Sequence, residues 1–262
     1  MRVLLVGDTH GNVGWLERVV YAAVQRHEAD LIFQVGDFGW WPRIATNDAF
    51  RAMARRAPVP LWWIDGNHED HASLERDIIG AGAMTSDGLV DLAGNLSFVP
   101  RGTRVDLDGV TVLACGGAHS IDRRARTVGI DWFDGEHVSD AEVDRCTEGG
   151  PVDVFICHDA PAGWTIPNLP SARGLPHLWH VELPACWDHR RQIARITEQV
   201  EPKLVVHGHY HCGYQLNLDM GSGPIDIVGL SEDGTADNLA LLDCLGGSWH
   251  IQRIPIGAET GR

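Results

Sequence analysis

Three histidines stand at alternate positions late in the chain: His207, His209 and His211, directly after Val205 and Val206. If the backbone stays extended here, alternate side chains point the same way, and the three imidazoles could face one point in space. Imidazole nitrogens are common metal ligands, so a histidine cluster at strand spacing suggests a metal site. These three residues alone do not form a catalytic centre, and further ligands must come from other parts of the chain.

Polar residues that could bind a metal follow three apolar runs in the first quarter of the chain. Residues 2–6, 31–35 and 61–64 are rich in β-branched and other apolar residues and are typical of buried parallel strands. The polar residues after them are Asp8-Thr9-His10, Gly36-Asp37 and Asp65-Gly66-Asn67-His68-Glu69. One Gly-Asp pair would be explained by turn geometry. Three such turns predict a site, because α/β proteins build their sites at the carboxyl edge of a parallel sheet.

The rest of the chain predicts the elements that carry these turns. Helices are expected near 13–27, 46–56, 139–147 and 188–200, with Ser139 capping the third, and strands at 152–157 and 203–206. Residues 88–114 alternate like short antiparallel strands, with a hairpin turn at Asp108-Gly109. Residues 116–137 and 160–186 are expected to be long irregular connections, and 213–254 a series of short strands. No linker or repeat interrupts the pattern, so we expect one domain over residues 1–262.

Charge and cysteine usage limit the classes of function. The formal net charge of −15 repels phosphate backbones, so no stable nucleic-acid complex is expected, whereas a metal could still attract a small phosphoester locally. The six cysteines form no Cys-x-x-Cys pair. We find no signal peptide and no apolar run of transmembrane length, and expect a cytoplasmic protein without membrane contact. The sequence does not indicate an oligomeric state.

The polar residues at predicted strand ends form one candidate constellation. They are Asp8, His10, Asp37, Asn67, His68, His158, His209 and His211. This set exceeds what one four-coordinate metal needs, and it fits two metals that share a carboxylate. Mixed nitrogen and oxygen ligation favours Mn, Fe, Zn or Ni over Mg or Ca.

In the order and type of these residues, the sequence closely resembles the calcineurin-like metallophosphoesterases. The family pattern is Asp-x-His, Gly-Asp, Gly-Asn-His-[Asp/Glu], a lone His, and Gly-His-x-His, each at a strand end. The matching blocks are Asp8-Thr9-His10, Gly36-Asp37, Gly66-Asn67-His68-Glu69, His158 and Gly208-His209-Tyr210-His211. The resemblance implies an α/β fold, a four-layer sandwich of two mixed β-sheets flanked by helices.

The resemblance also implies a role for each matching residue. One of two divalent metals, with Mn favoured and Fe, Zn or Ni as alternatives, would be held by Asp8, His10 and His211. The second would be held by Asn67, His158 and His209, with Asp37 as the bridge. His68 would be the catalytic residue, stabilising the phosphate or protonating the leaving group, and Asn67 would also contact the substrate. Hydrolysis would run by direct attack of metal-bound hydroxide, without a phospho-enzyme.

The second block departs from the family pattern. Many members continue it as Gly-Asp-x-x-Asp-Arg, whereas this chain reads Gly36-Asp37-Phe38-Gly39-Trp40-Trp41. The carboxylate that would orient His68 and the phosphate-binding arginine are absent, which argues against a calcineurin-type protein phosphatase. Substitutes could come from the connection that contains His119, Asp122, Arg123, Arg124 and Arg126. Arg123 and Arg124 are candidate substrate-binding residues, although arginines are ordinarily solvent-exposed.

We therefore expect a metal-dependent phosphoesterase for small phosphodiesters, with cyclic nucleotides as candidates. The reasons are the acidic charge, the missing arginine and an aromatic connection after His158; Trp40, Trp41, Trp164 and Trp179 could stack on a base. The alternatives are a phosphomonoesterase, including a nucleotide or protein phosphatase, and an inactive metal-binding scaffold. His207 is expected to pack beside the site. The other histidines, at 27, 71, 119, 137, 177, 180, 189 and 250, are expected on the surface or in the core.

Overall fold

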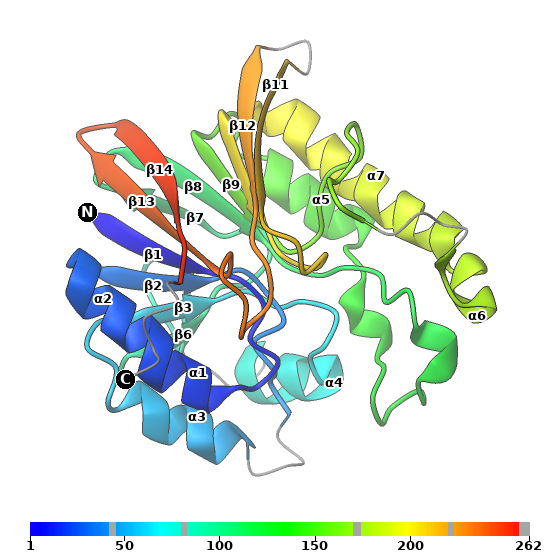
Figure 1. The fold of residues 1–262 in the computed structure, drawn as a ribbon, viewed down its shortest axis with the longest axis horizontal. Helices are drawn as coiled ribbons and strands as arrows, with labels where there is room; N and C mark the ends of the chain where they lie inside the picture. Colours follow the sequence, from blue (N-terminus) through cyan, green and yellow to red (C-terminus); the bar gives the residue numbers. More distant parts are fainter. Residues whose placement is uncertain (42–45, 80–82, 170–173, 220–222, 257–262) are drawn as a thin grey trace.

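Two β-sheets packed face to face form the centre of the molecule (Figure 1). The computed structural model describes residues 1–41, 46–79, 83–169, 174–219 and 223–256. The larger sheet has the order β14 (Ser248–Ile254), β13 (Leu239–Leu245), β1 (Arg2–Val6), β2 (Leu31–Gln34), β3 (Leu61–Trp63), β6 (Leu96–Phe98), β5 (Val90–Ala93) and β4 (Ala83–Met84). The smaller sheet has the order β11 (Tyr214–Asp219), β12 (Pro224–Gly229), β10 (Leu204–His207), β9 (Val154–Cys157), β8 (Val110–Cys115) and β7 (Arg104–Leu107).

Helices cover the outer face of each sheet, which gives four layers (Figure 1). The larger sheet is covered by α1 (Val13–Trp15), the π-helical η1 (Leu16–Val20), α2 (Tyr21–His27) and α3 (Thr46–Ala54). The smaller sheet is covered by α5 (Asp140–Thr147) and α7 (Leu183–Val200). Short helices are α4 (His71–Ser73), η2 (Leu74–Ile79), η3 (Arg123–Ala125), η4 (Asp134–Glu136) and α6 (His177–His180). This is the predicted α/β sandwich of two mixed sheets.

Strand alternation assigns each apolar residue to a layer. Leu5 of β1 packs between the sheets, whereas its neighbour Leu4 packs against the helices of the larger sheet. Both sheets are parallel at their centre and antiparallel at their edges. The carboxyl ends of β1, β2, β3, β9 and β10 therefore carry the turns that the sequence singled out.

Most predicted elements are confirmed, and two expectations need correction. The helix predicted at 188–200 begins earlier, at Leu183, and the capping box at Ser139 starts α5 as expected. The antiparallel prediction for 88–114 is only partly right. β6 pairs parallel with β3, and β8 pairs parallel with β9, because the two strands join the centres of different sheets. Within 160–186, residues 170–173 lie outside the described part of the chain. Among the described helices, none is long and apolar enough to cross a membrane.

A buried ion pair ties the turn after β3 to the rest of the sandwich. Asp65 is 1% exposed, and its Oδ2 lies 2.5 Å from Nη2 of Arg101, which is 8% exposed. Burial alone would raise the pKa of Asp65, but Arg101 and His71 hold it well below its ordinary value. This carboxylate therefore stays ionised and holds the chain two residues before Asn67.

Replacing Asp65 by asparagine is expected to lower the free energy of unfolding by about 3 kcal/mol, because the buried Arg101 guanidinium loses its buried counter-charge and keeps only the partly exposed Glu142, at 3.2 Å. Urea denaturation of the metal-free protein measures the loss. The double variant Asp65→Asn/Arg101→Met should recover part of it, since no unpaired charge remains. A double variant no more stable than Asp65→Asn would contradict this account.

Candidate metal centre

Polar side chains from five strand ends meet where the carboxyl edges of the two sheets adjoin. Asp8, Asp37 and Asn67 follow β1, β2 and β3 of the larger sheet, and His158 follows β9 of the smaller one. These four residues are at most 5% exposed. The His10 and His211 side chains, 27% and 37% exposed, form the open side of the cluster. The arrangement is a buried polar base with access from solvent.

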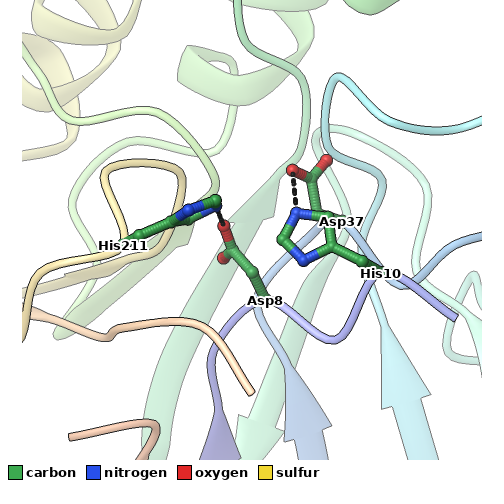
Figure 2. A group of neighbouring side chains, drawn as sticks. All are labelled: Asp8, His10, Asp37 and His211. Carbon is green, nitrogen blue, oxygen red and sulfur yellow. Dashed lines mark ion pairs between the residues drawn. The ribbon is translucent and has the colours of Figure 1, made fainter. Parts of the chain in front are cut away.

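The first group of donor atoms comes from Asp8, His10, Asp37 and His211 (Figure 2). One atom from each of the four lies within 4.8 Å of the others. His10 Nε2 is 3.4 Å from Asp37 Oδ2, and His211 Nε2 is 3.1 Å from Asp8 Oδ2. Two imidazole nitrogens and two carboxylates thus converge from segments far apart in the sequence.

The second group adjoins the first through Asp37. His158 Nε2 lies 3.4 Å from Asp37 Oδ1 and 3.3 Å from Asn67 Oδ1. The His209 ring centroid is 5.2 Å from that of His158. Asp37 therefore presents Oδ2 to one group and Oδ1 to the other, which is the geometry a bridging carboxylate needs.

Hydrogen bonds outside the cluster set the orientation of its imidazoles. His158 Nδ1 donates to the Val35 carbonyl oxygen over 2.9 Å, which leaves Nε2 free to bind a metal. His211 Nδ1 lies 3.1 Å from Glu232 Oε2, and His10 Nδ1 lies 3.8 Å from Asp233 Oδ1. Sequence reasoning missed Glu232 and Asp233, because two acids in a turn have no pattern that distinguishes them from ordinary surface residues.

Electrostatics show that the cluster attracts positive charge. Burial opposes protonation, but the hydrogen bond and charge of Asp37 raise the pKa of His10 to about 9. Burial also opposes protonation of His158, but the charge of Asp37 outweighs this effect and raises the pKa of His158 to about 10. Burial lowers the pKa of His209 to about 4, which keeps that ring neutral. Since metal binding displaces protons from histidines, this mixed set of donors fits divalent cations of the Mn or Zn class.

Two glycines of the sequence blocks make room for the carboxylates. A Cβ on Gly66 would lie 2.1 Å from Asp37 Oδ1, and one on Gly208 would lie 2.1 Å from Asp8 Oδ1. Any side chain at either position would displace a carboxylate of the cluster. The glycine in each of these two blocks is therefore part of the site, although it offers no ligand atom.

The three alternate histidines do not share one face of a strand, so that expectation is wrong. β10 ends at His207, and the next two histidines adopt left-handed backbone conformations, with φ of 68° at His209 and 50° at His211. His10 and Asp37 are also left-handed, with φ of 43° and 54°. Non-glycine residues rarely adopt this conformation, and it concentrates at functional sites.

His207 packs behind the cluster. It is fully buried, its Nδ1 donates to the Gly208 carbonyl oxygen over 2.9 Å, and its Nε2 accepts from the Tyr214 hydroxyl over 2.5 Å. Burial lowers the pKa of this ring to about 4, so it is neutral. Both ring nitrogens are engaged away from Asp8 and Asp37.

Replacing His207 by alanine is expected to cost about 2–4 kcal/mol of stability, through a cavity and the loss of the acceptor for the Tyr214 hydroxyl proton, while metal content stays unchanged. The same change at His209 or His211 should remove metal with less loss of stability. Thermal unfolding and metal analysis of the three variants test this. If His207→Ala lost the most metal, His207 would be a ligand.

His68 lies beside the cluster and contacts an arginine. Its backbone N–H donates to Asp37 Oδ1 over 2.8 Å. Its Nε2 accepts from Arg126 Nη2 over 2.6 Å, and Asp122 Oδ1 holds Arg126 Nε at 2.8 Å. The connection after β8 thus brings an arginine to His68 and a carboxylate, Asp122, to that arginine.

The other two arginines of this connection point elsewhere. Arg123 lies over the Trp132 ring at 4.1 Å, and Arg124 Nε is 2.6 Å from Glu182 Oε1. A role in substrate binding stays a prediction for both. Stacking on a base is excluded for Trp40 and Trp164 as they stand, since both are buried, at 1% and 7% exposure.

Comparisons with known proteins identify the family of this chain and its fold. The family model "Calcineurin-like phosphoesterase" matches residues 1–213. A lariat debranching enzyme from Arabidopsis thaliana is 22% identical over 283 residues, a match that covers all of this chain but 64% of that enzyme. The crystal structure of a dimetal phosphatase from Danio rerio superposes with a TM-score of 0.57 at 12% identity, covering 97% of this chain and 96% of that one. A hypothetical protein from Thermus thermophilus gives a TM-score of 0.48 at 14% identity, covering 97% of this chain and all of that one. By the extent of the family match, this chain belongs to the calcineurin-like phosphoesterases, a family of metal-dependent phosphoester hydrolases.

Proposed function

We propose that this chain hydrolyses small phosphodiesters at a centre of two divalent cations, with cyclic nucleotides as candidate substrates. Asp8, His10 and His211 would hold one cation, Asn67, His158 and His209 the other, and Asp37 both. Bound there, the cations supply Lewis-acid charge for the phosphate oxygens and lower the pKa of a water molecule. Mn²⁺ as the preferred ion and a cytoplasmic location stay predictions.

The contact between Arg126 and His68 is the observation that carries the choice of a diester. Of the three arginines on the connection after β8, Arg126 alone directs its guanidinium at a residue of the cluster. A diester carries one negative charge on its phosphate, which one arginine beside the cations can match, whereas a monoester dianion calls for more positive charge. The debranching activity named for the Arabidopsis thaliana relative supports a diester as well.

The side chains around the cations have separable tasks in this proposal. Asp122 holds Arg126, which turns from His68 to a non-bridging phosphate oxygen when substrate binds. That movement would free His68 Nε2 to take up a proton from solvent and to give it to the leaving oxygen as the phosphorus–oxygen bond breaks, which returns the ring to its neutral form. Asn67, whose Nδ2 donates to Ser120 Oγ over 3.0 Å, keeps its Oδ1 directed at the cluster.

Hydrolysis of bis-nitrophenyl and mono-nitrophenyl phosphate by the Mn²⁺-loaded protein tests the proposal. We expect a higher kcat/KM for the diester, and release of nucleoside monophosphate from a cyclic nucleotide. A preference for the monoester would instead make the chain a phosphomonoesterase. No hydrolysis of either ester by the fully loaded protein would make it a metal-binding scaffold.

Replacing Arg126 by alanine is expected to lower kcat/KM for the diester by about 10²-fold, mainly through KM, because a charge-assisted contact to phosphate contributes about 1.5–3 kcal/mol. Arg123→Ala and Arg124→Ala are matched controls from the same turn and should stay within about threefold of the parent. Steady-state kinetics of the three variants separate them. A larger loss at Arg123 or Arg124 would assign the phosphate contact to that residue.

A further inference from the structure

A second cluster of ligand atoms lies apart from the donors of the metal centre. It consists of His119, which follows β8, and of Glu136 and His137 at the end of η4. One donor atom from each of the three lies within 4.8 Å of the others. His119 is 2% exposed and Glu136 is fully buried, whereas the His137 side chain is 44% exposed. His137 also lines a cavity of about 800 Å³.

The spacing of the three donor atoms fits one face of a tetrahedral zinc site. His119 Nδ1 lies 2.6 Å from His137 Nε2, and Glu136 Oε1 lies 3.7 Å from the first atom and 3.3 Å from the second. Ligands at 2.0–2.1 Å from Zn²⁺ in a tetrahedron are roughly 3.3 Å apart. The two nitrogens would move apart by less than about 1 Å to reach that spacing. Two histidines and one glutamate with a fourth position open form a ligand set that binds zinc.

The surroundings hold these donors in the state that a cation needs. His119 Nε2 donates to Glu182 Oε2 over 3.0 Å, which leaves Nδ1 with its lone pair, and Arg124 Nε contacts the other oxygen of Glu182 at 2.6 Å. Burial lowers the pKa of His119, so its ring is neutral near pH 7. Burial would raise the pKa of Glu136, but hydrogen bonds from His137 and Ser120 outweigh it and lower that pKa to about 2. His137 Nε2 therefore carries the proton that it shares with His119 Nδ1 and Glu136 Oε1, and a cation bound between the three atoms would displace that proton.

We propose that His119, Glu136 and His137 form a third metal site, of the zinc class, in addition to the proposed catalytic pair. The site joins the two ends of the connection after β8, the segment that carries Arg126. Ser120 links it to the metal centre, because Ser120 Oγ donates to Glu136 Oε2 over 2.5 Å and accepts from the Asn67 side-chain amide. Occupancy of the third site would therefore stiffen the segment that holds Arg126 and Asn67 in place.

The experiment counts bound zinc and does not depend on activity. Chelator-treated protein is titrated with Zn²⁺ against a chromophoric chelator, in the parent and in His137→Ala. We expect His137→Ala to bind one equivalent fewer than the parent, or to bind its last equivalent at least tenfold more weakly. His250→Ala, which removes an exposed histidine of β14, is the matched control and should bind as the parent does. Circular dichroism checks the fold of each variant. Because the His137 side chain is largely exposed, we expect His137→Ala to stay folded, so that misfolding would not account for a loss of zinc.

Equal zinc stoichiometry and affinity in the parent and His137→Ala would overturn the third site, whatever the metal centre binds. A second variant removes zinc binding at the metal centre, so that the third site is measured alone. Asp8→Asn/Asp37→Asn removes both carboxylates of the metal centre and should still bind one equivalent, which the further change His137→Ala should abolish. If the double variant bound no zinc while folded, the third site would not exist. Failure of phosphodiester hydrolysis in the parent would leave these counts unchanged, so the two proposals fail separately.

Discussion

Replacing Asp37 by asparagine is expected to reduce phosphodiester hydrolysis by on the order of 10³-fold and to strip both cations from the purified protein. Asp37 faces both groups of ligands, with Oδ2 near His10 and Oδ1 near His158. The asparagine is close in shape and keeps an acceptor for the His68 backbone N–H. The change therefore removes mainly the negative charge between the two groups, without which neither cation is sufficiently neutralised.

Metal analysis and kcat at saturating Mn²⁺ measure this effect, and Asp233→Asn is its matched control. Asp233 also faces His10, but at Nδ1 and 3.8 Å away, so its loss disturbs only the orientation of one ligand. We expect the control to bind both cations with an affinity reduced about 10–100-fold. Two equivalents of metal in Asp37→Asn at ordinary affinity would show that Asp37 is no bridge.

The strand-end turns were predictable from sequence because parallel strands of one sheet end at a common edge. That rule predicts that Asp8, Asp37 and Asn67 lie together, and they follow three neighbouring strands of the larger sheet. It did not bring His158 and His209 to them, since these residues end strands of the other sheet. The shared position after a predicted strand put all of them in one candidate set, and the resemblance to the family supported that grouping, because no local pattern states that the carboxyl edges of two separate sheets adjoin.

Contacts made by irregular segments were not predictable. Strand alternation failed for His209 and His211 because both follow the end of β10 in left-handed conformations, which period-two patterns do not describe. Arg126, Asp122 and Glu182 belong to segments without periodicity, so their partners depend on tertiary packing alone. His119 and His137, expected on the surface or in the core, meet for the same reason: the connection after β8 folds back on itself.

Replacing His68 by alanine is expected to keep both cations and to lower kcat by about 10²–10³-fold for a diester with a poor leaving group. The hydrogen bond of His68 to the centre is made by its backbone N–H to Asp37, which alanine retains. Its ring is directed at Arg126 and stands 5.2 Å from the ring of His10, beside the proposed ligands but not among them. The change should therefore affect proton delivery and not metal binding.

A series of aryl and alkyl phosphodiesters distinguishes proton delivery from a structural role. A nitrophenolate departs without a proton, so His68→Ala should act on it almost as fast as the parent, while alkyl esters suffer the full loss. The dependence of log kcat on leaving-group pKa should accordingly become steeper. His68→Asn, which keeps hydrogen-bonding capacity but transfers no proton, should show the same steep dependence. An equal loss across the series would mean that His68 positions the phosphate through Arg126, and protonation of the leaving oxygen would then fall to water.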